Sequence, residues 1–316
     1  ESDLAIVKQD WQIIIDKIKA GKAHEISEGD TMYLAACTKG ANAKSMRKQP
    51  FSDIPAKQRA YSLKNSYMTA YVRRILMNED VISVFKPEEL KSKSVDELLH
   101  ERFAPYIGRT LYELKRHINF AENKNKAMYA NLVSDLLGIK GTSLDDTEEF
   151  AKANIKFKTI RLEPNGVPRE HMSFEQIDFD RWLNASWEES QVYETFENTK
   201  FLFVVFQFTE TERENPNRVP YLKGIKLWNM PEKIIETELK NLWKTVHDIL
   251  AVGVELTKTP RGVKNNLPGA KFNGVCHIRP KAANAADKVQ LPDGQMITKQ
   301  TYWLNREYIA EIVREL

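Results

Sequence analysis

The first part of the chain has the hydrophobic spacing of amphipathic helices. Apolar side chains at Trp11, Ile14, Ile15 and Ile18 recur three and four positions apart, which predicts a helix over residues 10–20. Gly21 then ends the pattern. Similar spacing predicts four further helices, over residues 53–77, 95–103, 110–118 and 124–137. The N-terminal part of the chain is therefore expected to be mainly helical.

The pattern changes to that of β-strands after residue 154. Residues 155–162 alternate and are rich in β-branched side chains. A Pro-Asn-Gly turn and a second such segment, 167–174, follow, which predicts a β-hairpin. The continuous apolar run at 201–208 is typical of a strand buried on both faces. Residues 221–228 are its expected partner strand.

The order of these elements predicts the fold class. The remaining pattern predicts helices over residues 187–196 and 231–252, a strand over 275–279, and a final strand and helix within 298–316. Helices followed by a mixed sheet with flanking helices indicate an α/β or α+β fold. We expect a mainly helical arm over residues 1–142 and a mixed-sheet lobe over residues 143–316, which together form one domain.

Composition excludes some classes of protein. The 316 residues are 42% hydrophobic and 29% charged, as in globular proteins, and no apolar run is long enough to span a bilayer. The chain begins with Glu1, without a signal peptide, so we expect a fragment of a longer cytoplasmic protein with no membrane partner. Cys37 and Cys276 lie far apart and are expected to be reduced thiols.

The distribution of charge says more than the net charge of +3. Residues 31–78 contain nine lysines and arginines against one acid, and residues 257–286 contain six against none. Two basic stretches on an otherwise acidic chain favour a surface that binds a polyanion such as nucleic acid. The alternative is ordinary solvated surface whose charges are balanced in space.

The strand at 155–162 resembles a nuclease strand that has lost its carboxylate. Many DNA nucleases place a carboxylate and a lysine two residues apart, so that both lie on one strand face and act with Mg²⁺. Here those positions hold Lys156 and Lys158. A lysine in the metal position repels Mg²⁺ by several kcal/mol at about 4 Å. We therefore expect no catalytic residue and no bound metal in this chain.

A second basic segment has the residue types that read base edges. Arg279 and Lys281 flank Pro280, and Asn284 follows among small residues. Arginine and lysine bond the guanine O6 and N7 atoms, while asparagine bonds adenine N6 and N7. A basic surface loop that contacts only phosphates, or nothing, is the alternative.

These motifs resemble MutH and the MutH-like restriction endonucleases that recognise GATC. The stretch IRPKAANA at 278–285 resembles the DNA-reading segment of MutH, and FKTIRLEPNG at 157–166 resembles its catalytic hairpin, whose general form is ELKTIPL. Five longer stretches resemble the C-terminal half of two-domain enzymes, namely residues 24–69, 201–207, 224–231, 265–268 and 297–305.

The resemblance implies a function for the chain. In such enzymes the N-terminal half cuts DNA with Mg²⁺, and the C-terminal half shares the fold, binds a second GATC copy and stimulates cleavage. The expected partners are thus GATC duplex DNA and an N-terminal catalytic domain of the same protein. The expected DNA-binding residues are Lys39, Lys44, Arg47, Lys264, Asn265, Arg279, Pro280, Lys281, Asn284 and Tyr302.

Some of these assignments have alternatives. Asn265 and Asn266, beside Lys264, could touch phosphate or base edges or could equally be ordinary turn residues, and Tyr302 could be core packing. Lys39-Gly40 resembles the start of the active-site helix of the family, but its later glutamate is absent from residues 47–49. Asp145 and Asp146 are the nearest candidates for the upstream aspartate, although the segment that follows them is about three residues too long by comparison with the family.

Two other functions compete with the regulatory one. Asp146, Glu163 or Glu170 could rebuild a carboxylate site in an active, Mg²⁺-dependent MutH-like endonuclease. The second competing function is that of a protein-interaction domain without a DNA role.

Overall fold

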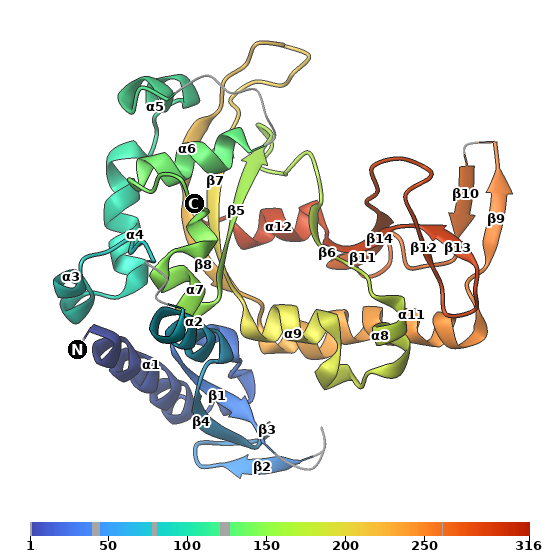
Figure 1. Cartoon of the computed structure of the whole chain (residues 1–316), viewed down its shortest axis with the longest axis horizontal. Helices are drawn as coiled ribbons and strands as arrows, with labels where there is room; N and C mark the ends of the chain where they lie inside the picture. The colour runs from blue at the N-terminus through green and yellow to red at the C-terminus, as the bar shows by residue number, and fades with distance from the viewer. Residues whose placement is uncertain (1, 40–44, 78–80, 121–126, 261) are drawn as a thin grey trace. The chain divides into compact units, whose positions relative to one another are not determined.

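The computed structural model describes residues 2–39, 45–77, 81–120, 127–260 and 262–316, which form two compact units (Figure 1). The first unit contains Glu1–Gly166, Glu197–Glu232 and Leu316, and the second contains Val167–Phe196 and Lys233–Glu315. The expected boundary at residue 143 lies inside the first unit. Both units contain helices and strands, so the α/β class is confirmed.

The first unit is built on a three-stranded sheet of β5 (Ile155–Leu162), β7 (Lys200–Gln207) and β8 (Tyr221–Asn229). The central strand β7 pairs parallel with β5 and antiparallel with β8. Its residues from Lys200 to Phe206 are all buried. The predictions of a doubly buried strand and of its partner are both confirmed.

The predicted hairpin after β5 is wrong. The following strand, β6 (Met172–Gln176), pairs with β14 (Gln300–Leu304) in the second unit. Strand β5 instead pairs along its whole length with β7, from Ile155 opposite Lys200 to Leu162 opposite Gln207. Strand β5 is at the edge of its sheet, so this pairing alone would leave room for a hairpin; β6 instead takes its partner from β14, with Gln176 opposite Thr301 and Met172 opposite Leu304, and this long-range pairing overrides the local turn signal.

Helices cover this sheet and supply its core. The apolar cluster of the first unit joins β7 and β8 to helices that include α4 and α6. Their bounds, and those of the other helices of this unit, are α1 (Ser2–Lys19), α2 (Asn65–Leu76), α3 (Pro87–Ser92), α4 (Val95–Phe103), α5 (Leu111–His117), α6 (Met128–Leu136) and α7 (Glu148–Ala153). The helices predicted over residues 10–20, 95–103, 110–118 and 124–137 are confirmed where the structure describes them.

The long helix predicted over residues 53–77 is wrong in its first half. That segment contains β3 (Ser52–Lys57) and β4 (Arg59–Leu63), and only α2 is helical. Strand β4 pairs with β1 (Leu34–Thr38), and β3 pairs with β2 (Met46–Gln49). Strand β3 forms a tight hairpin with β2, in which Gln49 lies opposite Ser52, whereas β4 gains its hydrogen bonds from the more distant β1, which local helical spacing cannot reveal. The described part of the expected mainly helical arm therefore contains β1 to β4.

The second unit contains small sheets and helices. Strand β14 lies between β11 (Cys276–Pro280) and β6. Two two-stranded pairs are β9 (Leu256–Thr259) with β10 (Gly262–Asn265), and β12 (Lys288–Gln290) with β13 (Met296–Thr298). The helices near these strands are α8 (Phe179–Asn184), α9 (Gln191–Asn198, which continues into the first unit), α11 (Lys240–Val252) and α12 (Arg306–Ile312).

The helix predicted over residues 231–252 is confirmed with one irregularity. It begins as α10 (Glu232–Ile234), passes through a π-helical turn at Ile235–Leu239 and continues as α11. Among the described residues, no helix combines the length and apolar character needed to cross a bilayer.

Candidate nucleic-acid interface

Strand β5 carries Lys156 and Lys158, and the carboxylate of Asp145 lies beside Lys156. Lys156 is exposed, and its Nζ lies 3.9 Å from Oδ2 of Asp145. The other oxygen of Asp145 accepts a hydrogen bond from the Phe157 N–H at 2.7 Å. Burial raises the pKa of the Asp145 carboxyl, whereas the Phe157 N–H and both lysines oppose that rise. Asp145 is thereby held at β5 with an ammonium as its counter-ion.

The position of Asp145 corrects the doubt raised by its distance along the chain. The residues between Asp145 and Lys156 include helix α7, which takes up the extra length. The aspartate therefore reaches β5 although the intervening segment is long. Spacing alone could not find this, because a helix shortens the path of the chain to about 1.5 Å per residue.

The structure shows where the candidate metal-binding carboxylates lie. Among residues that the structure describes, no group of three or more His, Cys, Asp or Glu side chains could hold a metal ion. Glu163 is bound by Arg218, with Nη2 of the arginine 2.8 Å from Oε1. Asp146 is exposed next to Asp145, and Glu170 is exposed in the second unit. The ammonium of Lys156 lies where a cation would otherwise bind Asp145.

A cavity of about 420 Å³ opens next to this pair. Helix α2 turns its polar face toward the cavity and contributes Thr69 and Arg73, while Asp145 and Lys156 line another side. Arg74 also lines it but is paired with Glu148 at 2.7 Å. The cavity is thus lined by both basic and acidic side chains.

The segment proposed to read bases lies on the surface of the second unit. Arg279, Pro280, Lys281 and Asn284 are all exposed. Lys281 Nζ donates to the Ser173 hydroxyl at 2.8 Å. The Asn284 side-chain oxygen accepts from the Ala286 N–H at 2.9 Å, and its amide nitrogen keeps its two donors for other partners. These residues therefore lie at the end of β11 and in the segment after it, with their side chains exposed on the second unit.

Tyr302 does not belong to this surface. It is only 2% exposed, its hydroxyl lies 2.8 Å from Thr195 Oγ1, and its ring stacks on Phe174. A ring so buried cannot meet DNA in this arrangement, and the core alternative holds. Its neighbour Trp303 is partly exposed and lies next to Arg279, with the two side chains in contact. Strand alternation required one of the two rings to face outward, but it could not tell which.

Lys264 and Asn265 end the β9–β10 hairpin of the second unit. Lys264 is exposed, with Thr257 opposite it on β9. The Asn265 side-chain oxygen accepts from the Leu267 N–H at 3.1 Å, which makes Asn265 a turn residue. Lys264 is thus exposed on a strand, whereas the Asn265 side chain stabilises the turn that follows.

The three basic residues near the N-terminus belong to the first unit. Lys39 follows β1 and is exposed, Arg47 is exposed on β2, and Lys44 lies outside the described residues. The expected resemblance to an active-site helix is wrong for residues 46–49, which form β2. The Lys39 N–H donates to the Gln58 carbonyl at 2.6 Å, so the lysine is held at the end of a strand pair.

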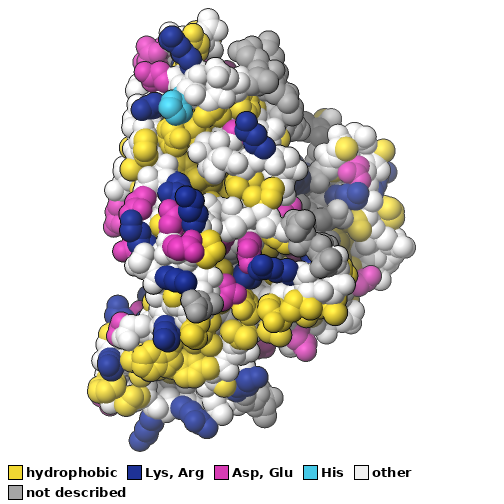
Figure 2. All heavy atoms as spheres, turned by 60° about the vertical axis from the view of Figure 1, so that its left-hand side comes forward, with side chains coloured by type: hydrophobic (Ala, Val, Ile, Leu, Met, Phe, Trp, Pro, Cys, Tyr) yellow, Lys and Arg dark blue, Asp and Glu magenta, His cyan; other side chains and the backbone are white. Residues whose placement is uncertain are grey.

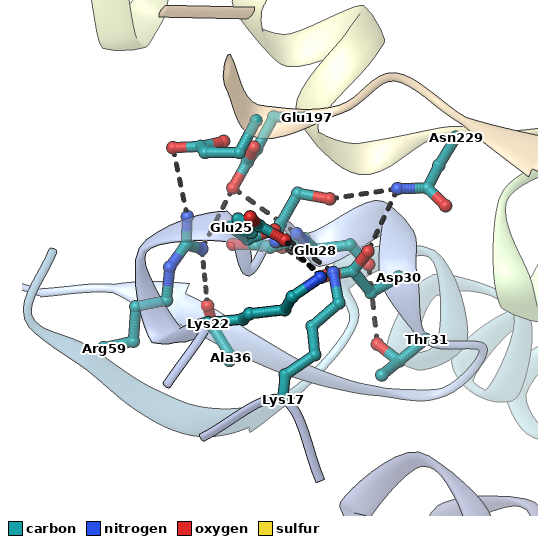
Figure 3. Close-up of polar contacts among 12 residues, drawn as sticks. Lys17, Lys22, Glu25, Glu28, Asp30, Thr31, Ala36, Arg59, Glu197 and Asn229 are labelled. Atoms are coloured by element: carbon teal, nitrogen blue, oxygen red, sulfur yellow. Dashed lines mark hydrogen bonds and ion pairs between the residues drawn. The ribbon is translucent and has the colours of Figure 1, made fainter. Parts of the chain in front are cut away.

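A buried ion cluster anchors these strands (Figure 3). Arg59 on β4 donates to the Ala36 carbonyl at 2.7 Å and to Glu197 Oε1 at 3.0 Å, and it reaches Glu232 at 3.5 Å. Lys57 also binds Glu232, at 2.7 Å. Burial, and then the negative charge of Glu232, raise the pKa of Glu197 to about 8, while Arg59 lowers it. The second oxygens of both glutamates are buried without a donor, which one shared proton would supply.

Charge on the visible surface is mixed rather than uniform. Figure 2 shows lysines and arginines interspersed with acids and with hydrophobic patches over the face that it presents. The candidate cations divide between the two units. The first unit carries Lys39, Arg47, Lys156 and Lys158, and the second carries Lys264, Arg279 and Lys281.

The family of the chain follows from its similarity to individual proteins. No family model matches the chain. The type II restriction enzyme Sau3AI of Staphylococcus aureus is 38% identical over 354 aligned residues, which cover 99% of this chain and 71% of that enzyme.

More distant similarity links the chain to DNA mismatch repair proteins. MutH of Actinobacillus pleuropneumoniae is 25% identical across 71% of this chain and 94% of its own length, and MutH of Vibrio campbellii is 28% identical across 59% and 77%. The mixed sheets with flanking helices are accordingly a MutH-like nuclease fold. The extent and identity of the first match show that this chain belongs to the Sau3AI family of type II restriction enzymes.

Proposed function

We propose that this chain binds duplex DNA at GATC and acts as the non-catalytic regulatory domain of a type II restriction endonuclease. A separate N-terminal catalytic domain of the same protein would cut, using Mg²⁺. A second GATC site on this chain would stimulate that cleavage. Tethering raises the effective concentration of the second site, and the coupling between the two sites must be reciprocal.

The single observation that carries the non-catalytic role is the Lys156–Asp145 pair. A cation in the family's carboxylate position takes the counter-ion role that Mg²⁺ would have. Lys158 remains at the other motif position, so the strand keeps affinity for phosphate without a metal to activate water.

Base recognition is assigned to the exposed loop of the second unit. Arg279 and Lys281 would bond guanine, and Asn284 would bond adenine. Lys39, Lys44, Arg47 and Lys264 would contact phosphates, which supply affinity but no sequence preference. Cys37 and Cys276 are free thiols, which fits a protein of the reducing cytoplasm.

A binding experiment with Mg²⁺ tests this function. The chain should bind a GATC duplex more tightly than a scrambled duplex, with affinity that falls as salt rises, and plasmid DNA should stay intact when Mg²⁺ is added. Equal affinity for both duplexes would contradict GATC recognition. Failure to bind either duplex would leave the protein-interaction alternative.

The ordered position of Asp145 favours one second candidate, an active endonuclease with a rearranged site. Asp145 and its neighbour Asp146 would then hold Mg²⁺ in place of the missing glutamate. Nicking of a GATC plasmid by the purified chain, dependent on Mg²⁺ and abolished by Asp145→Asn, would establish this reading. Engagement of Glu163 by Arg218 weighs against a contribution from that residue.

Replacing one side chain should create a metal site. In Lys156→Glu a carboxylate takes the place of the ammonium beside Asp145, and the two like charges attract Mg²⁺. With a Kd of about 1 mM, 10 mM Mg²⁺ would stabilise the variant by roughly 1.4 kcal/mol, a rise in Tm of about 2–4 °C. Thermal melting with and without Mg²⁺ measures this.

The matched control is Lys156→Gln, which removes the cation without adding a carboxylate. Neither it nor the wild type should respond to Mg²⁺. If Lys156→Glu melts at the same temperature with and without the ion, Asp145 and residue 156 do not form a potential metal pair.

A further inference from the structure

Arg279 is held by a neighbouring strand. In the β11–β14 pair, Trp303 lies opposite His277, and Arg279 lies two residues further along β11, opposite Thr301. The Trp303 indole N–H donates to the Arg279 carbonyl at 3.2 Å. The guanidinium carbon of Arg279 lies 5.7 Å from the Trp303 ring centroid. One tryptophan thus holds both the main chain and the side chain of this arginine.

Trp303 is itself supported from within the second unit. The His277 ring lies nearly parallel to it, at an angle of 14° and a centroid distance of 6.4 Å. His277 Nδ1 is hydrogen-bonded to Asn305 Oδ1, and Asn305 Nδ2 donates to the Ala270 carbonyl at 2.9 Å. The bond to the Ala270 carbonyl shows which end of the Asn305 amide carries the N–H groups. The amide oxygen therefore faces His277, and His277 Nδ1 must be the donor of the bond between them.

The His277 ring, which packs beside Trp303, remains uncharged at neutral pH. Burial lowers the pKa of His277 to about 4, and the charges of His171 and Arg279 act in the same direction. His171 packs edge-on against His277, with ring centroids 4.6 Å apart, and accepts the Arg306 N–H at 3.1 Å. The rings behind Arg279 therefore add no positive charge that would repel it.

We propose that Trp303 is a positioning residue for Arg279, which orders the guanidinium for base reading before DNA arrives. The inference rests on the proposed GATC recognition. An unrestrained arginine side chain loses much rotamer freedom on binding, whereas one stacked on an aromatic face has already lost part of it. The contact with the Trp303 ring is a cation–π interaction, which places no hydrogen-bond acceptor on the guanidinium N–H groups that would bond guanine O6 and N7.

A double-mutant cycle tests this role. Trp303→Leu should lower the preference for GATC over scrambled duplex by roughly two- to five-fold, the size of an exposed cation–π contact, with little change on scrambled DNA. Trp303→Phe keeps a ring and should lose less. In an Arg279→Ala background, Trp303→Leu should change the preference no further, because its effect acts through the arginine.

Controls separate positioning from folding. Trp11→Leu removes an exposed tryptophan from α1 in the first unit and should leave the preference unchanged. Circular dichroism checks that each variant is folded, and Trp303→Phe carries the comparison if Trp303→Leu is not. An equal loss of preference with and without Arg279 would overturn the proposal.

A second measurement distinguishes failure of this inference from failure of GATC recognition. The side-chain Nε–H signal of Arg279 should show a ring-current shift in the NMR spectrum of the free protein, and Trp303→Leu should abolish it. If the wild type binds both duplexes equally, GATC recognition fails, yet this shift still decides whether Trp303 orders Arg279. Absence of the shift in the wild type would overturn the positioning role.

Discussion

The Arg59→Leu variant should lose about 3–5 kcal/mol of unfolding free energy, because it removes one partner of a buried ion cluster. The side chain of Arg59 is 8% exposed, and Glu197 and Glu232, which it contacts, are buried. Leucine cannot bond the Ala36 carbonyl or either carboxyl group. Urea unfolding of the full chain measures the difference.

Arg74→Leu is the matched control. It removes an arginine that is also ion-paired, with Glu148 at 2.7 Å, but that arginine is exposed. Exposed ion pairs contribute about 0–1 kcal/mol to the unfolding free energy, so the unfolding free energy of this variant should be close to that of the wild type. Equal losses in the two arginine variants would contradict the importance of burial.

The same cluster should make stability depend on pH. The pKa of Glu197 is raised from 4.5 to about 8 in the folded chain, so folding favours its protonated form. Its stabilising contribution is fully present below about pH 4.5 and is lost as pH rises toward 8. Glu197→Gln, which cannot ionise, should flatten this decline. A decline of unchanged slope in Glu197→Gln would assign it to another group.

The Arg279→Ala variant should bind a GATC duplex roughly 1–3 kcal/mol more weakly while its affinity for scrambled DNA changes less. Arg279 is exposed at the end of β11, and its guanidinium is held against Trp303. Alanine removes the two donors that would bond guanine O6 and N7. Titrations of both duplexes at two salt concentrations measure the change in preference.

Arg47→Ala provides the comparison. Arg47 is exposed on β2 of the first unit and is expected to contact a phosphate. Its loss should weaken both duplexes alike and reduce the salt slope by about one. If Arg279→Ala instead weakens both duplexes equally, Arg279 is a phosphate contact and the proposed base reading by this residue is wrong.

Several elements followed from sequence alone because one local signal determined each of them. The apolar run of β7 required burial on both faces, and the helical spacing of α4 and α6 was sufficient to place them. The replacement of the motif carboxylate by Lys156 was also visible in the sequence. A charge in a metal position is a chemical fact that needs no fold to be recognised.

Tertiary structure decided the elements whose partners lie far along the chain. The helical spacing of residues 53–77 did not reveal that β4 pairs with the distant strand β1. The turn signal after β5 likewise did not reveal that β6 pairs with β14, which comes much later in the chain.

The candidate site divides in the same way. The sequence alone showed that residues 279–284 have side chains that can bond base edges. Only the fold shows that Tyr302 is buried and that Trp303 contacts Arg279. The fold also brings Asp145 to Lys156 by way of α7. Residue types and periodicity are local properties of the chain, whereas burial and counter-ion pairing depend on which distant segments pack together.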